Sequence, residues 1–102
     1  IFENNHVYEN GSHGVLFRNE NEQNSGHRNT FINNTIENNG INRESAGFYI
    51  GGETHDIKIT DNIIRSAGKG NQTIAIFIGK NSSKIIATDN NISGSKDIVY
   101  EK

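Results

Sequence analysis

The hydrophobic positions of this chain fall into short runs, separated by turns rich in Asn and Gly. Each run leaves three or four residues for a strand, as Phe31, Asn34 and Ile36 illustrate. Four segments share one pattern, in which Asn or Asp precedes an Asn and Val or Ile follows two residues later. They are residues 2–7, 31–36, 59–64 and 87–92. The chain therefore repeats a pair of short strands joined by an Asn turn.

The second Asn of each segment marks the length of the repeat. These markers are Asn5, Asn34, Asn62 and Asn90, and the steps between them are 29, 28 and 28 residues. A further strand signal follows in each copy, at residues 14–17, 47–50, 75–78 and 97–100. Repeats of this length are typical of solenoids. Each copy predicts a strand, an Asn turn, a second strand, a variable loop, a third strand and another loop.

Strands this short are not stable alone, because isolated hairpins are marginal in water. Stacked copies can pair each strand in parallel with its equivalents above and below. We therefore predict an all-β solenoid of about three to four coils that forms one domain over residues 1–102. The coils would span roughly 1–28, 29–56, 57–84 and 85–102. Alternation along the third strands directs one column of side chains outward, namely Leu16, Tyr49, Phe77 and Val99.

The marker asparagines predict an Asn ladder along the stack, formed by Asn5, Asn34, Asn62 and Asn90. After Gly, Asn tolerates left-handed backbone best, so we expect the markers to make the turns. Stacked Asn side chains can also bond to one another and to the turn backbone. Asp61 and Asp89 precede two markers, so we interpret them as turn residues and not as the paired carboxylates of a glycosidase.

Composition and charge exclude several classes of protein. The chain has 17 Asn and 16 Ile but one Leu, and it has no Cys. The scarcity of residues that favour helices excludes a helical bundle, and the lack of Cys excludes a disulfide scaffold. No apolar run is long enough for a membrane span. The net charge is −2 with both signs interspersed, so we expect neither a nucleic-acid partner nor a membrane partner.

The Asn turns and the stretch Asn10-Gly11-Ser12-His13-Gly14-Val15 carry a resemblance to a known family. The repeat resembles the right-handed parallel β-helix of the pectin-lyase-like superfamily over essentially the whole chain. The stretch looks like the Asn-Gly-x-His-Gly-aliphatic phrase of carbohydrate-active β-helices, including alginate epimerase-like modules. The resemblance implies right-handed coils, a polysaccharide partner and a secreted, periplasmic or cell-surface location. It does not fix the activity, because lyases, hydrolases, epimerases and adhesion modules share this fold.

In the resembled family, polysaccharide generally lies along the outer face of one sheet, which here is the sheet of third strands. Tyr49 and Phe77 would then stack on sugar rings, with Arg18 beside them at the start of the long loop 18–28. A lyase needs a base beside a uronate carboxylate and a cation to neutralise that carboxylate. Arg18, His13 and Tyr49 are the catalytic candidates. The alternatives are a solvated polar loop and an aromatic column that is buried by loops or by another chain.

Metal and cofactor signals are weak. Glu20 and Glu22 alternate in the long loop and would offer oxygens to Ca²⁺ if further ligands converged, but no Ca²⁺ motif is present. His6, His27 and His55 have no metal-ligand spacing. We therefore expect no cofactor and no metal ligands.

These features predict part of a secreted polysaccharide-active β-helix protein, in first place a lyase that acts on an anionic glycan. An epimerase or a hydrolase is the related enzyme alternative, and a non-catalytic carbohydrate-binding, adhesion or structural module is the other. The chain opens directly in patterned sequence at Ile1, so we expect coils to be missing on that side and these residues alone to be inactive. Self-association is expected through the coil ends or through the column Leu16, Tyr49, Phe77 and Val99.

Overall fold

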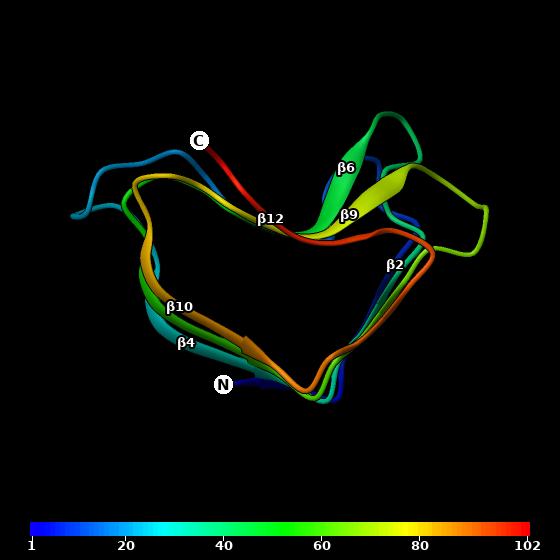
Figure 1. The fold of residues 1–102 in the computed structure, drawn as a ribbon, viewed down its shortest axis with the longest axis horizontal. Coiled ribbons are helices and arrows are strands. Elements are labelled where there is room, and N and C mark those ends of the chain that lie inside the picture. Colours follow the sequence, from blue (N-terminus) through cyan, green and yellow to red (C-terminus); the bar gives the residue numbers. More distant parts are fainter.

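The computed structural model describes all residues from 1 to 102, in twelve strands and no helix. Three strands form each coil, and four coils stack along one axis (Figure 1). The first strands of the coils are β1 (Phe2–Glu3), β4 (His27–Ile32), β7 (His55–Thr60) and β10 (Ser83–Thr88). The second strands are β2 (His6–Tyr8), β5 (Thr35–Glu37), β8 (Ile63–Arg65) and β11 (Asn91–Ser93). The third strands are β3 (Val15–Phe17), β6 (Ser45–Ile50), β9 (Gln72–Ile78) and β12 (Lys96–Tyr100).

Every strand pairs in parallel with the equivalent strand of the next coil, which gives three four-stranded sheets. The orders are β1-β4-β7-β10, β11-β8-β5-β2 and β12-β9-β6-β3. The predicted right-handed parallel β-helix is therefore the observed fold (Figure 1). Equivalent residues meet in register, as Leu16 meets Tyr49 and Tyr49 meets Phe77. The structure contains no helix long and apolar enough to cross a membrane.

The interior is a stack of β-branched and aromatic side chains, because one residue in two points inward along each short strand. Phe48, Ile57, Ile59, Ile64 and Ile76 are fully or almost fully buried in the two middle coils. The equivalent residues of the outer coils are only partly buried, because a neighbouring coil covers them on one side alone. The middle of the stack therefore carries most of the hydrophobic stabilisation.

The predicted Asn ladder is present between the first and second strands of each coil. Asn34 Oδ1 accepts hydrogen bonds from the backbone N–H of Asn5 at 2.9 Å and from its Nδ2 at 3.1 Å. The same pair of bonds joins Asn34 to Asn62 and Asn62 to Asn90. Each inner Nδ2 also donates to a carbonyl of an earlier strand, as Asn62 does to Phe31 at 3.1 Å.

The assignment of the left-handed backbone to the marker residues was wrong by one position. The residues with positive φ are those that precede the markers, namely Asn4, Asn33, Asp61 and Asp89, with φ between 56° and 61°. The reason is that the two residues of each Asn-Asn or Asp-Asn pair have different structural roles. The first residue makes the left-handed bend, which Asn and Asp tolerate, and the second turns its side chain inward to bond along the stack. Asp61 and Asp89 are thus turn residues, as predicted.

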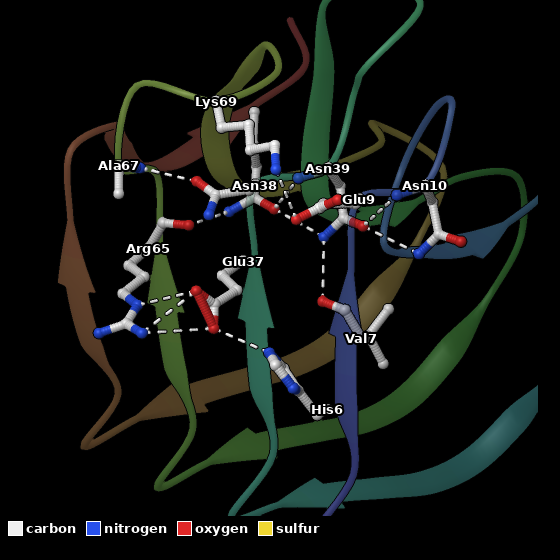
Figure 2. Close-up of polar contacts among 11 residues, drawn as sticks. His6, Val7, Glu9, Asn10, Glu37, Asn38, Asn39, Arg65, Ala67 and Lys69 are labelled. Atoms are coloured by element: carbon white, nitrogen blue, oxygen red, sulfur yellow. Dashed lines mark hydrogen bonds and ion pairs between the residues drawn. The ribbon is translucent and has the colours of Figure 1, made fainter.

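A second amide ladder lies after the second strands (Figure 2). Asn39 Oδ1 accepts from the backbone N–H and Nδ2 of Asn10, and Asn39 in turn donates to Oε1 of Gln72. Asn39 and Gln72 are completely buried. Glu9 and Asn38, which precede the first two members, again have positive φ. The sequence reading missed this ladder.

On the outer face of the β11-β8-β5-β2 sheet, Glu37 lies between the imidazole of His6 and the guanidinium of Arg65, which belong to the neighbouring coils (Figure 2). His6 Nε2 is 2.8 Å from Glu37 Oε2, and Arg65 NH2 is 3.1 Å from Glu37 Oε1. The hydrogen bond with His6 is the main cause that lowers the pKa of Glu37; Arg65 adds to it, while burial opposes it. This cluster joins three coils on their exterior.

Candidate functional site

The outer face of the β3-β6-β9-β12 sheet carries the predicted column of apolar side chains. Leu16, Tyr49, Phe77 and Val99 are successive partners in the register, as predicted. Leu16 is half-exposed, while the other three are partly buried. The long loop 18–28 leaves the column at the end of β3 and docks elsewhere, so it does not cover Leu16. Leu16 is therefore the most accessible member of the column.

The aromatic rings of the column stack on one another. The ring of Tyr49 lies 4.8 Å from that of Phe77 with an angle of 18° between their planes. On its other side lies the imidazole of His13, at 4.6 Å and 36°. Both faces of Tyr49 are thus covered, and its ring edge and hydroxyl remain available. Contact of Tyr49 and Phe77 with a sugar stays a prediction, but at Tyr49 it would use the edge and not the stacking face.

A cavity of about 370 Å³ opens beside this column and brings the three catalytic candidates together. His13, Arg18 and Tyr49 line it; they come from the loop before β3, the position directly after β3 and the last position but one of β6. The remaining lining residues are Leu16, Asn19, Glu20 and Arg43. Phe77 lies one step along the sheet, in a smaller adjoining cavity of about 180 Å³ that His13 and Tyr49 also line.

The hydrogen bonding of His13 fixes what its imidazole can do. Nδ1 accepts a hydrogen bond from the backbone N–H of Ala46 at 2.9 Å, so the neutral ring carries its proton on Nε2. Burial lowers the pKa of His13, and the nearby charge of Arg43 lowers it further. The ring therefore stays neutral at pH 7 and offers an N–H group. In this arrangement His13 is a hydrogen-bond donor and has no free nitrogen to act as a base.

The two arginines of the cavity differ in their pairing. Arg18 is largely exposed and lies 3.6 Å from a carboxylate oxygen of Glu20. Arg43 donates through Nε to the hydroxyl of Ser12 at 3.0 Å and has no carboxylate within 4.0 Å. A guanidinium stays protonated in proteins, so neither arginine is set up as a base. The cavity thus holds one compensated and one uncompensated positive charge.

The loop 18–28 is held against the loop of the second coil by several polar contacts. Glu53 N–H donates to the carbonyl of Glu20 at 2.9 Å, and Glu22 N–H donates to Oε1 of Glu53 at 2.9 Å. His27 lies stacked on His55, with ring centres 3.8 Å apart. These contacts fix the position of Arg18 and Glu20 at the mouth of the cavity.

The carboxylates of that loop do not converge. Glu20 faces Arg18, whereas Glu22 lies 3.5 Å from Nε2 of His55 on the other side of the loop. No group of three or more His, Asp or Glu side chains is arranged to hold a metal ion. His6 is engaged with Glu37, and His27 contacts the carbonyl oxygen of Glu22 at 2.6 Å.

Arg43 is the cavity residue that the sequence reading did not find. Arg43 lies in a loop between the ladder residue Asn39 and β6, and this loop is longer than the equivalent loop of the first coil. Asn10 and Asn39 are 29 residues apart, but Val15 and Phe48, which pair next, are 33 apart. The second coil therefore carries four extra residues between its ladder Asn and β6. Comparing these two offsets in the sequence would have revealed the insertion that contains Arg43.

Comparison with known proteins does not show a family for this chain. No family model, no curated protein and no solved structure gives a significant match to this chain. The class that the fold defines is the parallel β-solenoid, built here from three parallel sheets with an internal Asn ladder.

Proposed function

We propose that this chain is part of a secreted, polysaccharide-active β-helix protein of the pectin-lyase-like type and that its cavity binds an anionic glycan. The observation that carries the proposal is the uncompensated guanidinium of Arg43 in a cavity of about 370 Å³. Arg18 adds a second guanidinium to the same cavity. Planar guanidinium groups bind carboxylates with paired hydrogen bonds, so uronate carboxylates fit this site.

The neutral groups of the cavity suit a sugar. His13 Nε2–H and the Tyr49 hydroxyl offer polar contacts to ring hydroxyls, while Leu16 offers an apolar surface. Coils stack about 4.8 Å apart, which is close to the length of one sugar unit in an extended chain. A glycan that follows the stack axis would therefore place successive units beside successive coils, with one carboxylate at the two arginines.

Binding can be measured calorimetrically with pectate, alginate and a glycosaminoglycan, and with a neutral glucan for comparison. We expect at least one anionic glycan to bind, the glucan not to bind, and the affinity to fall as salt is added. Arg43→Gln should weaken binding by about 10- to 150-fold, because a hydrogen bond to a charged group contributes about 1.5–3 kcal/mol. Arg28→Gln is the matched control, since Arg28 is an exposed guanidinium on β4 without a carboxylate within 4.0 Å. Equal losses in both variants, or equal affinity for the glucan, would refute a specific site.

Lyase chemistry is the second candidate, and the shared cavity of Arg18, His13 and Tyr49 favours it. The step removes the proton beside a uronate carboxylate and expels the glycosidic oxygen, which leaves an unsaturated product. Arg43 or Arg18 would neutralise the carboxylate, and His13 would donate a hydrogen bond from Nε2. The Tyr49 oxygen, once its own proton has been lost to solvent, is the remaining group that would take the uronate proton, and it would pass that proton to the expelled glycosidic oxygen.

The ultraviolet absorbance of unsaturated uronate tests this step directly. Pectate, alginate and glycosaminoglycans would be tried with and without Ca²⁺. Product formation that disappears in Tyr49→Phe, with glycan affinity retained, would support Tyr49 as the base. Absence of product from this chain and from the longest available parent protein, with every anionic glycan that binds, would leave a binding module and remove the lyase.

A further inference from the structure

The smaller cavity beside the candidate site extends that site by one coil. His13 and Tyr49 line both cavities, so the two spaces adjoin. Leu16 of β3 and Tyr49 of β6 line the larger cavity, whereas Tyr49 and Phe77 of β9 line the smaller one. Equivalent positions of successive coils are about 4.8 Å apart. A glycan that is held at the larger cavity and follows the stack axis would therefore place its next sugar unit at the smaller cavity.

The two cavities differ in the charge of their lining. Arg18 and Arg43 line the larger cavity and do not line the smaller one, where Glu44 is the charged residue. Glu44 is exposed, and no Lys, Arg or His nitrogen lies within 4.0 Å of its carboxylate. Its negative charge is therefore not compensated by an ion pair. The site offers positive charge to one sugar unit and negative charge to the next.

The smaller cavity also has an apolar part. Ala46, Ile74 and Phe77 line it together with Glu44 and the hydroxyl-bearing Thr73, around a volume of about 180 Å³. Binding sites of this kind use apolar side chains for contact and a few polar groups for orientation. The lining therefore suits a small substituent that combines a methyl group with an N–H donor. The acetamido group of an N-acetylated amino sugar has both.

We propose that the glycan bound here alternates a uronate with an N-acetylated amino sugar, and that Glu44 selects this alternation. The inference rests on the proposed binding of a uronate carboxylate at Arg43. The Glu44 carboxylate would accept a hydrogen bond from the acetamido N–H, while the acetamido methyl group packs against Ile74 and Phe77. A chain of uronates alone would place a second carboxylate beside Glu44, where the two negative charges repel each other.

The test compares oligosaccharides of equal length by calorimetry. Hyaluronan and unsulfated chondroitin alternate a uronate with an N-acetylated amino sugar, whereas oligogalacturonate and oligomannuronate contain uronates only. The parent chain should bind at least one alternating oligosaccharide about fivefold more tightly than either uronate oligomer, which is the effect of one close pair of like charges in water. Glu44→Gln should bind the uronate oligomers about fivefold more tightly than the parent chain does. Its affinity for the alternating chain should be retained, because the Gln side-chain oxygen still accepts from an N–H.

Glu3→Gln is the matched control, since Glu3 is an exposed carboxylate on β1 without a cationic nitrogen within 4.0 Å. It removes the same charge from a different sheet and should leave both affinities unchanged. Uronate oligomers that bind the parent chain as tightly as the alternating ones would overturn the inference. So would an equal gain in Glu44→Gln and Glu3→Gln, or no gain in Glu44→Gln. In those cases a loss of binding in Arg43→Gln would still support the proposed anionic-glycan site, whereas no binding of either class would overturn both proposals.

Discussion

The strongest structural prediction concerns Asn62, whose side chain is 1% exposed in the middle of the ladder. Replacing it by Ala removes the acceptor for Asn34 N–H and the donor to the carbonyl of Phe31. Both groups belong to buried residues, and a buried polar group left without a partner costs about 1–3 kcal/mol. Asn62→Ala should therefore lower the free energy of unfolding by about 3 kcal/mol. This is a large share of the roughly 5–15 kcal/mol of a typical domain.

Asn5→Ala is the matched control at the end of the same ladder. Asn5 is exposed, and Asn34 Oδ1 would still accept from the backbone N–H at position 5. We expect a loss below about 1 kcal/mol, in the range of surface substitutions. Urea unfolding followed by circular dichroism at low protein concentration measures both values, with the slope against urea as a check on two-state behaviour. Equal losses in Asn62→Ala and Asn5→Ala would refute the claim that the buried ladder stabilises the stack.

Two other predictions concern the exterior cluster and the close packing of the third strands. Because the pKa of Glu37 is lowered in the folded state, its stabilising effect should be present above its ordinary pKa of 4.5 and disappear as the pH falls through the lower folded pKa. The difference in unfolding free energy between the parent chain and Glu37→Gln should therefore shrink as the pH is lowered below 4.5, and a pH-independent difference would contradict this. Gly47→Ala should lose about 1–3 kcal/mol, since an added Cβ would lie 2.8 Å from the Ala75 carbonyl oxygen and 2.9 Å from Ile64 Cγ2. In Gly11→Ala the added Cβ would approach only the Asn42 side chain, so thermal melting should place that variant close to the parent chain.

The fold could be predicted from the sequence because the repeat is nearly regular. A constant step places equivalent residues of successive coils in contact, so the marker asparagines and the column from Leu16 to Val99 could be read directly. The second ladder could not, for two reasons. Its third member is Gln72 and not an Asn, and it follows Asn39 at 33 residues instead of 28. The longer side chain of Gln72 still brings Oε1 within hydrogen-bond distance of Asn39. A search for identical residues at a constant spacing does not reveal this contact.

The candidate site lies where the regular repeat is interrupted. Phe17 and Ile50 pair at an offset of 33 residues, but His27 and His55 pair at 28, so the loop that carries Arg18 is five residues longer in the first coil. The loop that carries Arg43 is four residues longer in the second coil than in the first. Both insertions border the same cavity.

Residues that recur in every coil and residues of the longer loops therefore have different roles. Residues that recur in every coil bond to one another, as the ladder amides Asn34 and Asn62 of the two middle coils do through both their backbone N–H and their side chains. The loop of Arg43 is four residues longer than the equivalent loop of the first coil, so the charge of Arg43 is not matched from that coil. Arg43 shows this, because it keeps an uncompensated guanidinium beside an otherwise regular sheet. Removing the four-residue insertion of the second coil should therefore abolish glycan binding while leaving the Asn ladder and the three sheets intact.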